Sequence, residues 1–184
     1  LSTKAEKNPS LAKNVNITGT INMYQLCLNQ IKKYKDSIRF FFPSSIAIYN
    51  MSEKPYLFPI SENQFCNNPH TIYGESKLIC EKEGIKYSQM HENIDFRCIR
   101  FPGIVSSETI PTGGTSDYAS EIIHSAILGK KYFCYVDSQT TLPFMIMPDA
   151  VDAIIKLMST PLHELYSKIY NITSFSPSVT ELEN

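Results

Sequence analysis

Short apolar runs alternate with long amphipathic stretches along this chain, and this alternation limits the possible fold more than any other feature. The run from Ile38 to Phe42 is almost wholly apolar, as expected of a parallel strand covered on both faces. Asn8-Pro9-Ser10 caps a long pattern of apolar residues near helical spacing that extends to Ile31. Strands that alternate with long helices predict a mainly parallel α/β sheet.

The same signals place the remaining elements. We expect strands at residues 38–42, 96–101, 132–136, 144–147 and 169–172, and helices at residues 11–31, 71–91, 117–128 and 148–158. Residues 46–49 continue the first strand after a serine turn, residues 50–70 form a proline-containing loop, and a capped helix begins at Ser178. No internal repeat or linker divides the chain, so we expect a single domain.

The composition excludes several classes of function. The chain has 184 residues, is 42% hydrophobic and carries a net charge of −1, which suits a globular domain and argues against nucleic-acid or membrane partners. Its five cysteines are scattered without a disulfide framework, as in intracellular proteins with reduced thiols. Its four histidines show no ligand spacing, so we assign no metal.

A tyrosine and a lysine stand four residues apart in the second expected helix. Tyr73 and Lys77 therefore share one helix face, and an ammonium beside a phenol favours the ionised phenol. We expect this pair to lower the tyrosine pKa from about 10 toward neutrality, so that the phenolate can accept a proton from an alcohol. Pro43, Ser44 and Ser45 stand upstream of this pair, at the end of the first apolar run.

The glycines do not provide a phosphate-binding loop. The chain has only seven, and none form the G-x-G-x-x-G pattern that follows the first strand of a dinucleotide-binding sheet. Gly113-Gly114 lies too far along the chain to replace it. The chain begins at Leu1 and stops at Asn184 as a helix begins, so we expect both ends to be cut and the phosphate-binding segment to be missing.

Three segments in one order resemble the extended short-chain dehydrogenase/reductase superfamily. They are residues 42–49, the Tyr-Gly-Glu-Ser-Lys run of residues 73–77, and residues 100–103. The resemblance implies a doubly wound, mainly parallel Rossmann-type sheet, incomplete at its N-terminus, with a small C-terminal substrate-binding part. It also implies roles for the matching positions. The implied catalytic residues are Ser45, Tyr73, Lys77 and Asn16, of which Asn16 would sustain a proton relay through water. The implied NAD-binding residues are Leu1, Tyr73, Lys77, Pro102 and Ile104.

Five blocks, two of which overlap these segments, narrow the resemblance to the short-chain L-threonine 3-dehydrogenases. The most specific are residues 113–119, Gly-Gly-Thr-Ser-Asp-Tyr-Ala, and residues 140–150, which begin Thr-Thr-Leu-Pro. This resemblance implies NAD-dependent oxidation of the L-threonine 3-hydroxyl to 2-amino-3-oxobutyrate. The implied substrate-binding residues are Ser2, Ser44, Ser45, Tyr73, Gly114, Thr115, Ser116 and Asp117, with Asp117 suited to the ammonium.

The resemblance also implies an organisation for the chain. Residues 1–184 would be one truncated dehydrogenase domain, in which 1–103 are the remainder of the dinucleotide-binding sheet and 104–184 are substrate-loop and C-terminal elements. The helices with Asn16 and Tyr73 would form a homodimer interface. The expected compartment is the cytoplasm or the mitochondrion.

Two other functions stay open at this point. An extended-family epimerase or reductase acting on a nucleotide sugar uses the same catalytic residues, although the short threonine-type loop disfavours it. A truncated, inactive homologue would explain the missing phosphate loop, although it gives no reason to keep Asn16, Ser45, Tyr73 and Lys77 together.

Overall fold

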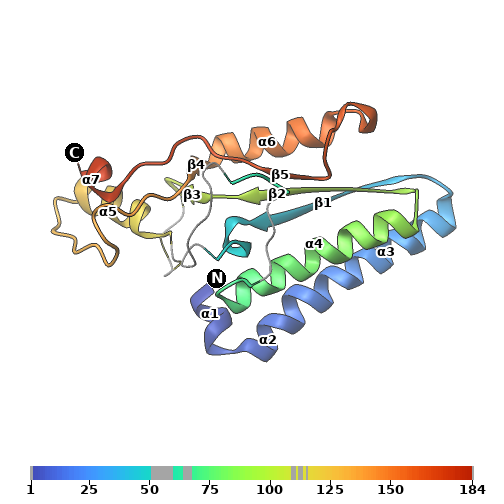
Figure 1. The fold of residues 1–184 in the computed structure, drawn as a ribbon, viewed down its shortest axis with the longest axis horizontal. Helices are drawn as coiled ribbons and strands as arrows, with labels where there is room; N and C mark the ends of the chain where they lie inside the picture. Colours follow the sequence, from blue (N-terminus) through green and yellow to red (C-terminus); the bar gives the residue numbers. More distant parts are fainter. Residues whose placement is uncertain are drawn as a thin grey trace.

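A three-stranded parallel sheet forms the centre of the molecule, in a computed structural model that describes residues 2–50, 60–63, 68–108, 111, 114 and 116–183. Its strands are β1 (Ile38–Ser45), β2 (Ile94–Phe101) and β5 (Ile169–Asn171), in the order β1-β2-β5. The long helices α3 and α4 cover one face of this sheet and α6 covers the other (Figure 1). The prediction of a mainly parallel α/β fold is confirmed.

The helical layer begins at the N-terminus with four consecutive elements. These are α1 (Ser2–Lys7), α2 (Pro9–Lys13), a π-helical turn η1 (Asn14–Thr18) and α3 (Gly19–Tyr34). Asn8 caps α2 as predicted, because its side-chain oxygen accepts the Leu11 N–H at 3.1 Å. The second predicted helix is α4 (Ile72–Met90), which Thr71 caps.

The middle strand β2 has both faces buried, and its alternating side chains divide the core in two. Phe96 and Cys98 pack beneath α3 and α4. Ile99 and Phe101 pack on the opposite side, beneath α6. This alternation, with a period of two residues, assigns each β2 side chain to one helical layer or the other.

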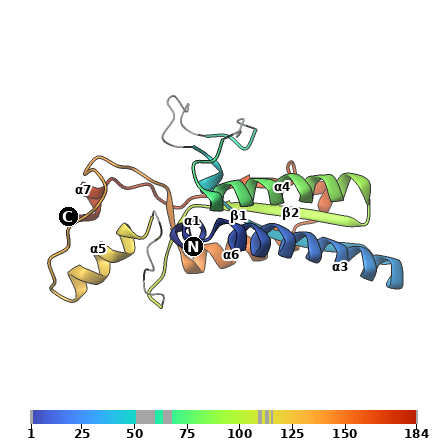
Figure 2. The same ribbon diagram turned by 90° about the horizontal axis from the view of Figure 1, so that it is seen from below.

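The helices α5 (Tyr118–Ile127) and α7 (Val179–Glu183) lie at one end of the molecule, set away from α3 (Figure 2). Two short parallel strands form a second sheet there. The elements that follow β1 and β2 are η2 (Ile46–Ile48), β3 (Gly103–Val105), α5 (Tyr118–Ile127), β4 (Phe144–Ile146), α6 (Met147–Ser159), η3 (Leu162–Glu164) and α7 (Val179–Glu183).

The structure confirms most predicted elements and corrects two. Residues 132–136 alternate in exposure as a strand would, but they pair with no strand among the described residues and instead pack side chains near α5. Ile46–Ile48 is a 3₁₀ turn and does not continue the strand. The sequence analysis did not predict α1 or β3. Most of the predicted loop at 50–70 lies outside the described residues.

Candidate active site

Tyr73 and Ser45 meet where the first turn of α4 approaches the end of β1. The Ser45 hydroxyl caps η2 by accepting the Ala47 N–H at 3.2 Å, and it lies close enough to the Tyr73 hydroxyl to lower the pKa of that phenol. Gly74 makes this approach possible, since a Cβ there would lie 2.1 Å from the Ala47 carbonyl oxygen. The glycine after the tyrosine therefore has a structural reason, which is the close contact of α4 with η2.

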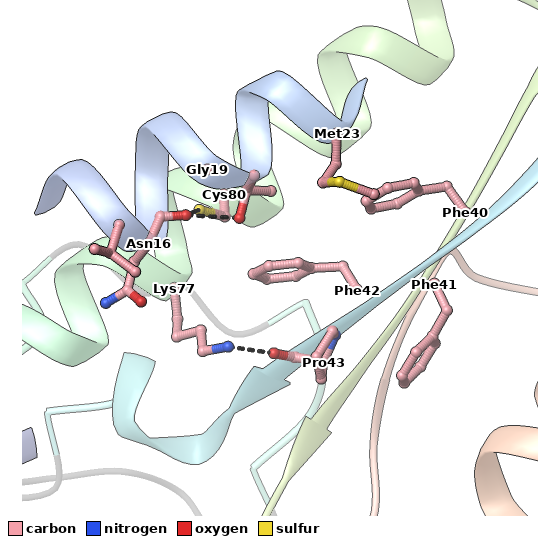
Figure 3. Close-up of a pocket in the computed structure, with 11 residues that line it drawn as sticks. Asn16, Gly19, Met23, Phe40, Phe41, Phe42, Pro43, Lys77 and Cys80 are labelled. Atoms are coloured by element: carbon pink, nitrogen blue, oxygen red, sulfur yellow. Dashed lines mark hydrogen bonds between the residues drawn. The ribbon is translucent and has the colours of Figure 1, made fainter. Parts of the chain in front are cut away.

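Lys77 lies one helical turn further along α4 and reaches the same strand end. Its Nζ donates to the Pro43 carbonyl oxygen at 2.6 Å (Figure 3). The ammonium lies 4.9 Å from the centre of the Phe42 ring and 5.6 Å from that of Tyr73. The predicted cluster of serine, tyrosine and lysine is thus brought together at the carboxyl end of β1.

The pKa directions differ from those expected. Burial raises the pKa of Tyr73, and the hydrogen bond with Ser45 lowers it by less. Burial lowers the pKa of Lys77, against the effect of nearby thiols and of Glu81. The prediction of a Tyr73 pKa lowered toward neutrality is wrong for this structure, because desolvation dominates and the Lys77 ammonium is bonded to a backbone carbonyl.

Asn16 lies in the π-helical turn, opposite Lys77. Its carbonyl oxygen accepts the Thr20 hydroxyl at 2.6 Å and the Cys80 thiol at 3.4 Å. Asn16 and Lys77 both line a cavity of about 380 Å³ between α3, β1 and α4 (Figure 3). They also line a second cavity, of about 260 Å³, to which Tyr73 contributes. The sequence analysis predicted the asparagine but not the π-turn, which has no clear sequence signal.

Ser44 and the residues after β2 are placed less directly. The Ser44 side chain is 3% exposed, and its hydroxyl has no hydrogen-bond partner among the described residues. Pro102 is buried where β2 passes into β3, and Ile104 is 36% exposed. These placements neither confirm nor contradict the predicted binding roles.

The predicted substrate loop is partly described. Asp117 accepts the Gly114 N–H at 2.7 Å, and the Gly114 carbonyl accepts the Tyr135 hydroxyl at 3.1 Å. The Asp117 carboxylate therefore closes the loop on itself. Ser116 is half-buried and lies against Gly103 at the start of β3. Leu1, Thr115 and the side chain of Ser2 lie outside the described residues.

A buried ion pair beneath the site was not predicted. Arg100 of β2 donates from Nε and Nη2 to the Glu81 carboxylate of α4, with contacts at 3.0 and 2.8 Å. The two side chains are 6% and 2% exposed. Their signal in the sequence is a charged residue within a buried strand and a glutamate one turn after Lys77.

Comparisons with known proteins agree with this arrangement. The model of the NAD dependent epimerase/dehydratase family matches residues 2–173. The mitochondrial L-threonine 3-dehydrogenase of Bos taurus is 36% identical over 183 residues, which are 99% of this chain and 46% of the bovine protein.

Solved structures show the same relationship. The L-threonine 3-dehydrogenase of Trypanosoma brucei superposes with a TM-score of 0.85 at 38% identity, over 98% of this chain and 53% of that one. The holo form of the GalE-like L-threonine dehydrogenase of Cupriavidus necator gives 0.82 at 36% identity, over 97% and 56%. The chain thus spans about half the length of these relatives and has the Rossmann-type dehydrogenase fold. It belongs to the NAD-dependent epimerase/dehydratase family of extended short-chain dehydrogenases/reductases.

Proposed function

We propose that this chain carries the catalytic part of an NAD-dependent L-threonine 3-dehydrogenase. The observation that carries the proposal is the placement of Tyr73 and Lys77 at the carboxyl end of β1, where the Lys77 ammonium lies 5.6 Å from the centre of the Tyr73 ring and donates to the carbonyl of Pro43, two residues before Ser45. Relatives that bear this activity in their names support the choice of substrate.

The cluster suits the oxidation of an alcohol. Ser45 would hold the L-threonine 3-hydroxyl, and the ionised Tyr73 oxygen would accept its proton. NAD, when bound, takes the hydride that leaves C3 with its electron pair, and the carbon–oxygen bond becomes the ketone of 2-amino-3-oxobutyrate. Because burial raises the pKa of Tyr73, we expect this proton transfer to depend on any further positive charge that enters the site.

The described residues fit the ribose end of NAD. Lys77 and Asn16 line both cavities, and Tyr73 lines the smaller one, so donors and acceptors for ribose hydroxyls face this space. We assign Lys77 and Tyr73 to that ribose. Pro102, Ile104 and Leu1 remain proposed contacts for the rest of the cofactor.

The substrate site is proposed at the loop after β3. Ser45 and Tyr73 would hold the reacting hydroxyl, while Gly114, Thr115, Ser116 and Asp117, together with Ser2 and Ser44, would hold the amino-acid groups. The Asp117 carboxylate already accepts the Gly114 N–H. In this proposal the same carboxylate would also contact the ammonium group of L-threonine, and the loop would stay closed.

A homodimer is proposed through the helices that carry Asn16 and Tyr73. Apolar side chains on α2 to α3 are exposed, including Leu11 (56%), Val15 (62%) and Leu26 (47%).

Among the described residues, no helix is both long and apolar enough to cross a bilayer. We propose the cytoplasm or the mitochondrion as the compartment, the latter because the bovine relative is mitochondrial.

The decisive test is turnover by the purified full-length gene product, followed as NAD reduction with L-threonine. We expect activity with L-threonine, none with a UDP-sugar, and a loss of about 10²- to 10⁴-fold in kcat for Tyr73→Phe. Tyr87→Phe, on the same helix but outside the site, is the matched control. Absence of both turnover and NAD binding would reject the proposal in favour of an inactive homologue.

A further inference from the structure

A buried polar network centred on Arg100 connects the catalytic helix with the segment that follows β1. Besides its two contacts with Glu81, Arg100 donates from Nη1 to the Tyr49 hydroxyl at 2.7 Å and to the Glu62 carbonyl at 3.1 Å. The Tyr49 hydroxyl in turn donates to the Asn171 side-chain oxygen at 2.9 Å. One guanidinium therefore links three separate parts of the chain.

The first arm of this network ends on α4. Glu81 lies one turn after Lys77 and two turns after Tyr73, so the three residues share one side of the helix. A guanidinium that binds a carboxylate through two parallel N–H bonds fixes direction as well as distance. The contact between Arg100 and Glu81 therefore restricts rotation of α4 about its axis, which decides where Tyr73 points.

The second arm ends beside Ser45. Tyr49 directly follows the 3₁₀ turn that Ser45 caps, and the Arg100 guanidinium also lies 5.3 Å from the centre of the Tyr49 ring. Arg100 itself stands in register with Ser44 of β1, at the carboxyl end of the sheet. The turn that presents the Ser45 hydroxyl is thus held by the same side chain as the catalytic helix.

We infer that Arg100 is a positioning residue for the proposed reaction. Through Glu81 it fixes α4, and through Tyr49 it fixes the turn of Ser45, so that one buried side chain sets the separation of Tyr73 from Ser45. This inference rests on the proposed function. Misplacement of a reacting group by about 1 Å can cost about 10²-fold in rate, which makes such a support measurable.

Arg97 of the same strand supplies a matched control. It is also fully buried, but on the opposite face, where it binds Asp95 and the carbonyl oxygens of Leu157 and Thr160 at the end of α6. Arg→Lys at either position keeps the charge and removes the two-pronged geometry. Both variants disturb a buried ion pair, and only one of those pairs touches α4.

The experiment compares Arg100→Lys with Arg97→Lys in the full-length gene product. We expect Arg100→Lys to lower kcat with L-threonine by about 10²-fold while the KM changes by less than about threefold, as for loss of an interaction made in the transition state. We expect Arg97→Lys to lower the urea midpoint and to keep kcat. Equal kcat in both variants would overturn the inference.

A second readout does not depend on turnover. In protein labelled with 3-fluorotyrosine, the ¹⁹F resonance of Tyr73 is the one missing from Tyr73→Phe. We expect Arg100→Lys to shift it and Arg97→Lys to leave it unmoved. If the wild type fails to oxidise L-threonine, the proposed function fails while this resonance still decides the positioning role. If Arg100→Lys does not fold, Tyr49→Phe replaces it, and an unmoved resonance in that variant would reject the role.

Discussion

The two faces of the sheet hold an ion near their helices in different ways. On the α4 face, the half-buried Lys77 ammonium donates to the Pro43 carbonyl, and desolvation lowers its pKa. On the α6 face, the Asp95 carboxylate lies between Arg97 and Arg39, with hydrogen bonds of 2.6 and 3.1 Å. Lys77 thus faces a backbone carbonyl beside the proposed site, although Arg100 and Glu81 form a complete ion pair further along the same face, whereas Asp95 is paired with two arginines.

A single strand can therefore serve stability on one face and the proposed chemistry on the other. Because side chains alternate along β2, Arg97 and Arg100 point to different helical layers. A change at Arg97 acts on the end of α6, and a change at Arg100 acts on the helix of Tyr73 and Lys77. Variants on each face test whether these two effects are independent.

Lys77→Met gives the largest expected effect and removes the half-buried ammonium beside the proposed site. Methionine keeps the length of the side chain and needs no hydration, so we expect the unfolding midpoint to stay equal or rise. We expect kcat to fall by about 10²- to 10⁴-fold. Turnover assays and thermal unfolding on one preparation measure both quantities. A destabilised but active variant would contradict the comparison.

Asp95→Asn removes the partner of Arg97 and tests the α6 face. Breaking a buried ion pair typically costs about 3–5 kcal/mol, and we expect urea unfolding to show a loss near the lower limit because two carbonyls still bind Arg97. We expect kcat to be unchanged. A fall in kcat at constant stability would show that the two faces are coupled.

The pH dependence of stability provides the control for this variant. Burial raises the pKa of the Asp95 carboxyl, but the hydrogen bonds from Arg97 and Arg39 outweigh it, and the net pKa is lowered. The carboxylate therefore contributes its full stabilisation above its unfolded pKa of about 3.9 and loses it as the pH falls through the folded value. Wild type should lose more stability than Asp95→Asn below about pH 4.

Gly84→Ala gives a smaller effect and tests the packing of α4 itself. A Cβ there would lie 2.2 Å from the Phe96 ring and 2.6 Å from the Tyr24 hydroxyl, so we expect a loss of about 1–3 kcal/mol. Gly19→Ala is the matched control, because nothing lies within 4 Å of its Cβ. We expect it to gain about 0.5–1 kcal/mol in urea unfolding. Equal stabilities would show that α4 can shift on the sheet.

Local patterns were sufficient to predict most elements of this fold. The apolar run at residues 38–42 and the cap at Asn8 identify β1 and the first long helix, because burial and capping act over a few residues. Residues 132–136 misled the prediction, since alternation alone cannot reveal whether a partner strand exists. The relation of Ser45, Tyr73 and Lys77 came from the order of motifs, which their placement supports.

The parts that the sequence did not reveal depend on contacts between distant residues. The pairing of Arg100 with Glu81 and the direction of the Tyr73 pKa both require the depth of burial, which no motif encodes. The loop closed by Asp117 looked available for a ligand, and only its contact with Gly114 shows that the carboxylate already has a structural task.

The π-turn at Asn14–Thr18 has a consequence for the direction in which the start of the chain faces. An α-helix advances about 100° per residue, and the wider π-turn takes in one extra residue without changing the phase of the flanking helices, so winding the same residues as a regular α-helix would swing α1 and α2 around the axis by about that angle. Glu6 accepts the Ile72 N–H at 2.7 Å, and Lys13 pairs with Glu75 at 2.9 Å; both contacts would be lost. The wide turn thus works as a phase correction that keeps the start of the chain docked on the beginning of α4.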